Sequence, residues 1–138
     1  MKKQLFSLIA LGLLFITASA YAQTVNVKAN IPFDFAVDQQ TMPRGEYKVE
    51  TISTGSSQSL LIRSTDGSVQ KVQLGRSCEL LRASESSKMV FHRYGDRYFL
   101  AQVWTAGNSF GYEFSESRLE KELAKASTAT NVSIASLR

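Results

Sequence analysis

The feature that most constrains the fold is a strict alternation of residue types between Val25 and Val37. Every odd-numbered position in this segment is apolar, whereas most even-numbered positions are polar. Successive side chains of a β-strand point to opposite faces, so a two-residue period predicts a strand with one buried face. An α-helix would spread the same residues around its axis. Pro32 lies on the polar face and has no N–H for a neighbouring strand, so we expect an edge, a bulge or a bend there.

Further strands are predicted along the rest of the chain. Residues 42–45 match a type I turn, with Pro43 in the second position and Gly45 in the fourth. Beyond this turn, short apolar segments bounded by polar or glycine-containing loops indicate strands. They cover residues 46–52, 60–63, 69–74, 77–82, 89–94 and 97–104.

The hairpin of residues 89–104 has the clearest register. Gly95 and Asp96 form a two-residue loop, which pairs Phe91 with Leu100 and His92 with Phe99. Apolar residues occur on both faces of this hairpin: Phe91, Tyr98, Leu100 and Trp104 on one, and Val90, Phe99, Ala101 and Val103 on the other. We therefore expect a central hairpin that is covered on both sides.

A second hairpin, residues 60–74, has two candidate registers. A three-residue loop that ends in a glycine bulge at Gly67 would place Leu60 opposite Val72, on the face that also carries Ile62 and Leu74. A strict two-residue Asp-Gly loop would place Leu60 opposite Gln73 instead. The bulged loop is favoured because it puts the apolar residues of both strands on one face.

The C-terminal part predicts one helix. Ser117 and Glu120 have the spacing of a capping box, which opens a short helix near residues 117–125 that could cover the second face of the central hairpin. Residues 127–138 are either a flexible tail or a final strand. The expected fold is therefore mainly β: a single antiparallel barrel or sandwich of about seven to eight strands with one short C-terminal helix, within residues 23–126.

The first 22 residues have the pattern of a secretory signal peptide. A basic start with Lys2 and Lys3 precedes an apolar run over residues 5–18, and Ala20 and Ala22 give an A-x-A cleavage site. The run of about 14 residues is short for a membrane span of roughly 20. We therefore expect a secreted or periplasmic bacterial protein, with no membrane span after removal of the signal.

The charge of the processed chain gives no support for nucleic-acid binding. The full chain of 138 residues carries a net charge of +4, and removal of Lys2 and Lys3 lowers it to +2. The remaining cations are scattered rather than clustered, which is not the pattern of a nucleic-acid interface. We predict a partner that is either a small ligand or an envelope protein.

The candidate ligand-binding residues cluster around the turn of the central hairpin. Arginine and aromatic side chains together suit anionic or sugar-like ligands and protein contacts, although they also pair well across an exposed sheet. The set is His92, Arg93, Tyr94, Arg97 and Tyr98.

The catalytic alternatives are weaker, and no catalytic residue is assigned. Cys78 with His92 could form a thiol nucleophile and base, but no family signature surrounds Cys78. A glycosidase would need a pair of carboxylates, for which Asp34 with Asp38 or Glu113 with Glu116 are candidates. The sequence contains no signature of the cleft that such a pair requires. A single histidine without a second histidine or cysteine nearby predicts no metal site, and no motif indicates a cofactor. In an oxidising compartment Cys78 could instead form an intermolecular disulfide.

Three segments together resemble a family of small secreted bacterial proteins of unknown function. They are VKANIPFDF at residues 27–35, MPRGEYKV at residues 42–49 and VFHRYGDRYFLAQVW at residues 90–104. The resemblance covers nearly the whole processed chain, with Met42 where the family more often has leucine. It implies export and a mainly β domain, and no activity.

These observations leave three functions open. The first is a non-enzymatic binding or cell-envelope module that holds a small ligand or a partner. The second is a purely structural envelope protein. The third is a small hydrolase that uses His92 with a nearby acid or with Cys78.

Overall fold

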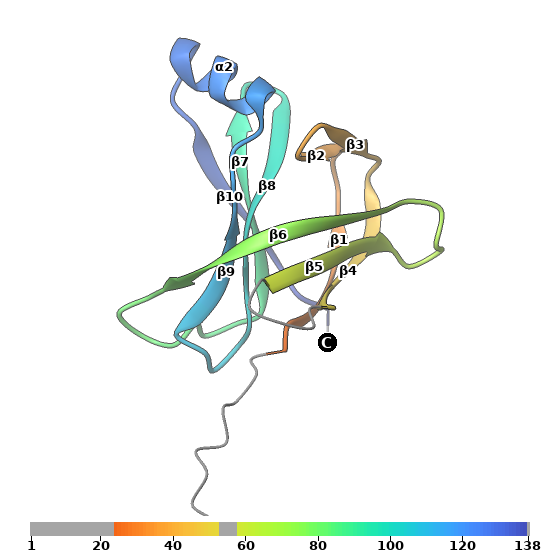
Figure 1. Ribbon diagram of the computed structural model, residues 1–138, viewed down its shortest axis with the longest axis vertical. Helices are drawn as coiled ribbons and strands as arrows, with labels where there is room; N and C mark the ends of the chain where they lie inside the picture. Colours follow the sequence, from red (N-terminus) through yellow and green to blue (C-terminus); the bar gives the residue numbers. More distant parts are fainter. Residues whose placement is uncertain (1–23, 53–57, 138) are drawn as a thin grey trace, which may run out of the picture.

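The computed structural model describes residues 24–52 and 58–137, which form ten strands and one helix (Figure 1). The predicted signal peptide, residues 1–22, lies outside the described residues. The mainly β fold with one helix is confirmed. The elements are β1 (Asn26–Ile31), β2 (Phe35–Val37), β3 (Gln40–Met42), β4 (Gly45–Thr51), β5 (Gln58–Ser64), β6 (Gln70–Glu79), β7 (Lys88–Tyr94), β8 (Arg97–Trp104), β9 (Phe110–Phe114), α2 (Arg118–Ala126) and β10 (Thr130–Ala135).

The N-terminal alternation forms two strands rather than one. β1 ends at Ile31 and β2 begins at Phe35, so the chain leaves the sheet at Pro32, where the missing N–H cannot support a ladder. Val25, the odd-numbered residues of β1 and both ends of β2 are buried in the core, as the two-residue period predicts. A turn with Asp38 in the left-handed region (φ 54°) then leads directly into β3.

The strands form one open, mixed sheet, so the predicted closed or layered arrangement of seven to eight antiparallel strands is wrong. The hydrogen-bonded order is β1-β4-β5-β6-β9-β8-β2-β3, with β7 beside β8 and β10 beside β7. One edge of β8 is shared: β9 pairs with its C-terminal part, and β2 runs parallel to it at Phe99. This branch point adds β2 and β3 to the sheet and makes it mixed.

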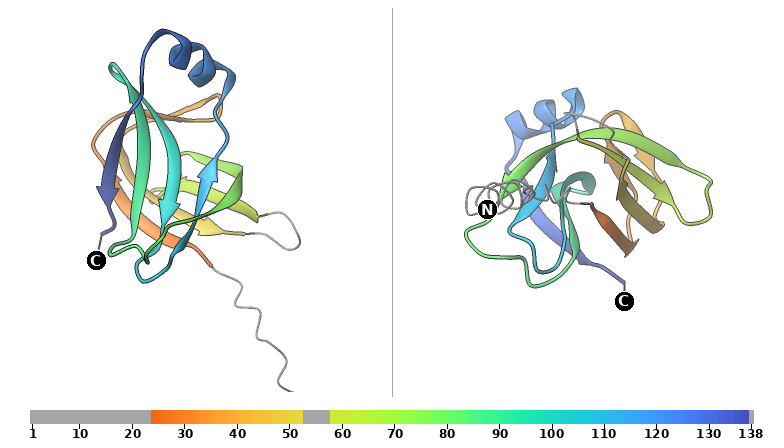
Figure 2. Two further views of the ribbon diagram at one scale, coloured as in Figure 1. Left: turned by 90° about the vertical axis from the view of Figure 1, so that its left-hand side faces the viewer. Right: turned by 60° about the horizontal axis from the view of Figure 1, so that its bottom comes forward.

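The sheet curls until its first and last strands approach each other (Figure 2). The backbone N–H of Leu137, just after β10, donates a hydrogen bond of 2.7 Å to the carbonyl of Lys28 in β1. No ladder joins β1 to β10 in the described part of the chain, so the curled sheet stays open at this point.

The central hairpin has the predicted pairs, with one change of face. Phe91 lies opposite Leu100, and His92 lies opposite Phe99. A bulge at Val90 and Phe91 leaves Ala101 without an opposite residue, so the faces exchange beyond it. Leu100 and Val103 therefore share the core face, and Trp104 does not join them there as the simple alternation predicted.

The favoured register of the β5–β6 hairpin is wrong. Leu60 lies opposite Gln73, which is the pairing expected from the strict two-residue loop. Leu60 is fully buried, whereas Val72 and Leu74 point to the other face and are 52% and 62% exposed. β6 is also longer than predicted, because it continues through Gly75 and joins the segments expected as two separate strands.

Aromatic packing closes the inner face of the curled sheet. The Phe91 ring meets those of Phe33 and Phe35 edge-on, with centroids 5.0 and 5.3 Å apart. Phe35 also packs edge-on against Tyr47. Edge-to-face pairs at these distances are the favoured geometry of aromatic rings. In the described part of the chain, no helix is long and apolar enough to cross a membrane.

Candidate functional site

The helix α2 lies near the turn end of the β7–β8 hairpin (Figure 1) and carries an acidic side chain of the candidate site, Glu120. Ser117 is its N-cap, and its hydroxyl accepts a hydrogen bond of 3.1 Å from the backbone N–H of Glu120. This is the first half of the predicted capping box. The carboxylate of Glu120 points instead toward the hairpin, where it contacts His92 and Tyr94.

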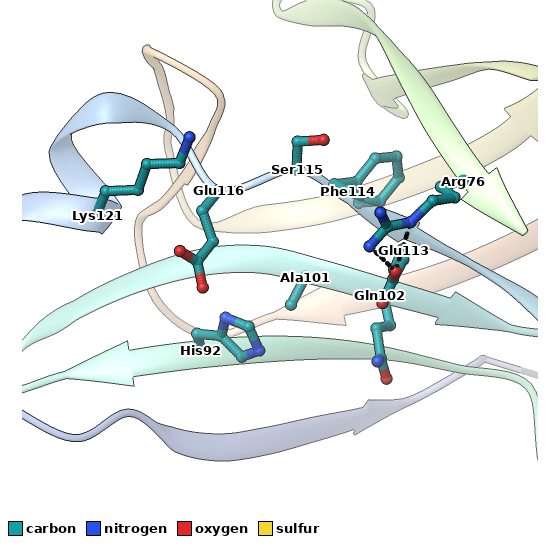
Figure 3. Close-up of a pocket in the computed structure, with 9 residues that line it drawn as sticks. All are labelled: Arg76, His92, Ala101, Gln102, Glu113, Phe114, Ser115, Glu116 and Lys121. Atoms are coloured by element: carbon teal, nitrogen blue, oxygen red, sulfur yellow. Dashed lines mark hydrogen bonds and ion pairs between the residues drawn. The ribbon is translucent and has the colours of Figure 1, made fainter. Parts of the chain in front are cut away.

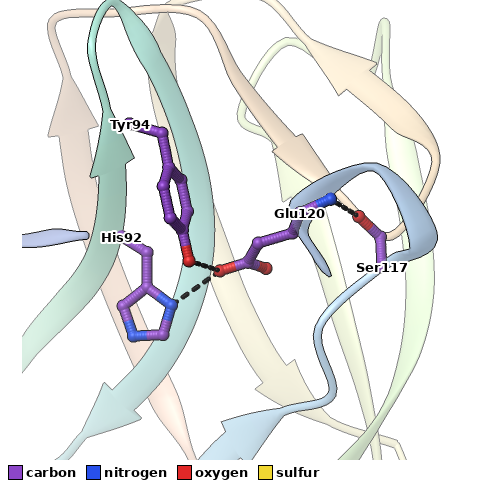
Figure 4. A network of polar contacts seen from close by, with 4 residues as sticks. All are labelled: His92, Tyr94, Ser117 and Glu120. Carbon is purple, nitrogen blue, oxygen red and sulfur yellow. Dashed lines mark hydrogen bonds and ion pairs between the residues drawn. The ribbon is translucent and has the colours of Figure 1, made fainter. Parts of the chain in front are cut away.

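Glu120 is the centre of a buried polar network (Figure 4). Its Oε1 lies 2.7 Å from Nδ1 of His92 and accepts a hydrogen bond of 3.3 Å from the hydroxyl of Tyr94. Glu120 is only 4% exposed, which is unusual for a carboxylate without a strong partner. Burial, reinforced by the charges of Glu120 and Glu116, raises the pKa of Tyr94 to about 12. Tyr94 therefore remains a hydrogen-bond donor at neutral pH.

A cavity of about 380 Å³ adjoins this network (Figure 3). Side chains from four strands, from α2 and from the segment between β9 and α2 line it. Those residues are Arg76, His92, Ala101, Gln102, Glu113, Phe114, Ser115, Glu116 and Lys121. Arg76 and Glu113 form an ion pair across β6 and β9 at one end. Polar groups thus dominate the walls, with Ala101 and Phe114 as the apolar part.

Glu116 brings a second carboxylate to His92. It lies just before Ser117, and Figure 3 shows its side chain directed toward the imidazole. One ligand atom each from His92, Glu116 and Glu120 lie within 4.8 Å of one another, so the three side chains could hold a metal ion. The sequence argument against a metal site considered only histidine and cysteine as partners of His92.

The structure divides the five predicted binding residues between two faces of the hairpin. His92 and Tyr94 lie under α2 and belong to the network of Glu120. Arg93 and Tyr98, which are opposite each other, face the other way. Tyr98 stacks on Phe33 with centroids 3.7 Å apart, and the Arg93 guanidinium lies 5.5 Å from the centre of the Tyr98 ring. Strand alternation therefore separates residues that are dense in sequence.

Arg97 and Tyr98 line a second, smaller cavity of about 190 Å³ between the hairpin turn, β2 and the start of α2. Asp34, a member of one proposed carboxylate pair, lines this cavity and accepts a hydrogen bond of 2.8 Å from the backbone N–H of Arg44. Its proposed partner Asp38 forms an ion pair with Lys71 instead. The other proposed pair, Glu113 and Glu116, does line one cavity, the larger one.

Cys78 is separate from the candidate site. It lies on β6 opposite Gly111, and it does not line the cavity that contains His92. Partial burial, together with the charge of Glu113, raises the pKa of its thiol. A raised pKa reduces the thiolate fraction at neutral pH, and the thiolate is the nucleophile. The geometry therefore gives no support to a Cys78–His92 pair.

The sequence spacing predicts only a role in capping the helix for Glu120 and does not place it in the site. Glu116 lies one residue before the N-cap, so it reaches the site from the segment that leads into the helix and not from a helical turn. His92 and Glu120 are 28 positions apart in the sequence, so no local pattern predicts their contact.

Comparisons with family models, with curated proteins and with solved structures find no match to this chain.

Proposed function

We propose that this protein is a non-enzymatic binding module of the secreted or periplasmic space, and that its ligand is a small polar molecule held in the cavity under α2. The observation that carries the proposal is this cavity of about 380 Å³, which is lined by polar side chains from distant parts of the chain. Its size lies within the range of small-molecule sites, roughly 300–1,000 Å³. Export rests on the signal-peptide pattern of residues 1–22.

The lining residues define the chemistry of the ligand. Arg76 and Lys121 offer positive donors, Glu113 and Glu116 offer negative acceptors, and Gln102 offers both an amide donor and an acceptor. Such a mixture suits a ligand with several hydroxyl, amine or carboxylate groups rather than a purely apolar one. A small molecule of this kind fits the expectation of a binding module that contacts its ligand through few, well-placed polar groups.

The experiment that tests this function is native mass spectrometry of the untagged protein purified from its own host. We expect a bound mass of a few hundred daltons that is retained at low collision energy. Ser115→Trp should abolish this adduct, because Ser115 is exposed on the cavity wall and an indole there would fill the space. Thr128→Trp places the same group on an exposed site beyond α2 and should retain the adduct. No adduct in the wild type, or equal adducts in both variants, would contradict the function.

A hydrolase is the second candidate, because His92 and Glu120 are in contact beside a cavity. A carboxylate on one ring nitrogen orients a histidine for general-base catalysis at the other. In Figure 4 the second ring nitrogen points away from Glu120. This candidate predicts turnover of a panel of ester and amide substrates that His92→Ala eliminates. Turnover that persists in His92→Ala would exclude it.

A further inference from the structure

We propose that His92, Glu116 and Glu120 form a binding site for Zn²⁺ at the wall of the cavity under α2. The inference deepens the proposed function and rests on it in one respect, because the same cavity would hold the ligand beside the ion. The site combines one imidazole nitrogen with two carboxylate oxygens from two distant segments.

The charge balance of the cluster favours a divalent cation. Two carboxylates converge on one histidine, and Glu120 is almost completely buried. Glu120 contacts His92, which pairs with it as a cation only when protonated; among the described residues, no lysine or arginine forms an ion pair with Glu116 or Glu120. Buried carboxylates are normally paired or bound to a metal, because an uncompensated charge is costly away from water.

The distances suit a tetrahedral ion after small side-chain movements. Zinc bonds of about 2.0–2.2 Å place neighbouring ligand atoms roughly 3.3–3.5 Å apart. The atoms of the cluster lie within 4.8 Å of one another, and Nδ1 of His92 is 2.7 Å from Oε1 of Glu120. Glu116 is exposed and belongs to no helix or strand, so its side chain can complete the set. The identity of the donors, one nitrogen and two oxygens, fits zinc better than magnesium or calcium.

The surroundings of the cluster have the features of a built metal site. The hydroxyl of Tyr94 donates to Glu120, and the Ser117 cap fixes the backbone from which Glu120 projects. Such outer contacts orient metal ligands and raise affinity. Three protein ligands leave a fourth position open, and His92 and Glu116 also line the cavity. The open position can therefore accept a donor atom of the bound molecule, as in zinc sites that keep one position for water or substrate.

The test is isothermal titration of ZnCl₂ into the untagged protein after dialysis against a chelator. We expect one Zn²⁺ per chain and at least tenfold weaker binding in Glu116→Gln, the loss that even a change outside the ligand set can cause. Glu116 is exposed, so this variant should keep its fold, which circular dichroism checks. Glu122→Gln is the matched control, because Glu122 is an exposed glutamate on α2 that pairs with Lys125. Its zinc affinity should stay within twofold of wild type, and MgCl₂ should give no comparable heat.

Two outcomes would overturn the zinc site: less than half an ion per chain, or equal affinities of wild type and Glu116→Gln. His92→Gln gives a second check if it folds, since it removes the only nitrogen ligand. A failed zinc titration with a retained small-molecule adduct in native mass spectrometry would reject the metal and leave the binding function in place. Zinc binding without any adduct in the host-purified protein would reject the small-molecule binding function and leave the metal site in place.

Discussion

Leu60 on β5 lies directly opposite Gln73 on β6, and this pairing turns the apolar residues of β6 away from the core. Residues opposite each other share one face of a sheet, so Gln73 faces inward with Leu60. A shift of one residue moves a whole strand to the other face, which is why Val72 and Leu74 are exposed. The outer face of β6 is thus more apolar than its inner face.

This register predicts unequal effects of two leucine substitutions. Leu60→Ala should lower the free energy of unfolding by about 2–5 kcal/mol, the usual loss for a buried leucine. Leu74→Lys should change it by less than about 0.5 kcal/mol, because the side chain lies in solvent. Urea unfolding of the two variants measures both values. If Leu74→Lys were as damaging as Leu60→Ala, Leu74 would face the core and the register would be wrong.

Gly111 is predicted to be the less replaceable of two strand glycines. A Cβ at Gly111 would lie 2.5 Å from the Trp104 ring and 2.7 Å from the backbone oxygen of Val103. Gly111→Ala should therefore lower the free energy of unfolding by about 1–3 kcal/mol, the usual effect of overpacking. The matched control is Gly75→Ala, whose closest contact would be the end of the flexible Leu60 side chain. Thermal unfolding should show the smaller loss for Gly75→Ala, and the opposite order would contradict this packing.

The raised pKa of Tyr94 predicts a loss of stability at alkaline pH. Burial and the Glu120 charge raise this pKa from the ordinary tyrosine value of 10.0 to about 12, so between these pH values the phenol is ionised in the unfolded chain and neutral in the folded one. The contribution of the neutral phenol is complete below about pH 10 and is lost as the pH rises through 12. Tyr94→Phe should remove this part of the pH dependence.

At neutral pH, Tyr94→Phe should also lower the free energy of unfolding by about 1 kcal/mol, because the hydrogen bond to Glu120 is lost. Urea unfolding at pH 7, 9 and 11 measures both effects. Identical slopes of stability against pH in the two proteins would show that Tyr94 does not titrate in this environment.

The turn between β5 and β6 contains a carboxylate with a low pKa. Asp66 accepts a hydrogen bond of 2.6 Å from the Ser64 hydroxyl, and two more from the backbone and hydroxyl of Ser68. These bonds lower its pKa to about 2. The stabilisation is present above the ordinary value of 3.8 and is lost as the pH falls through 2.

Removing the strongest of these donors should raise the Asp66 pKa. In Ser64→Ala, NMR titration of the side-chain carboxyl should show a clear upward shift. Thr65→Ala, at the next position of the same turn, should leave the value unchanged. A wild-type Asp66 that titrates near pH 4 would contradict the hydrogen bonding seen here.

Local sequence patterns predicted much of the fold because the forces behind them act over a few residues. The alternation up to Val37 identified the buried face of β1 and β2, and Gly95 with Asp96 determined the register of β7 with β8. The Ser117–Glu120 spacing located the start of α2. Pro32 interrupts the first strand because proline has no N–H to donate.

Only the tertiary structure decided how these pieces combine. Whether Leu60 meets Val72 or Gln73 depends on the whole sheet, since both loops are locally acceptable. The branch at β8 depends on two strands that pair with different parts of one edge, β9 near its C-terminal end and β2 at Phe99. The candidate site depends most on tertiary structure. Strand alternation separates His92 from Arg93, and the placement of the start of α2 brings Glu116 and Glu120 to His92. Contacts between residues far apart in sequence follow from the packing of complete elements, which no short-range periodicity contains.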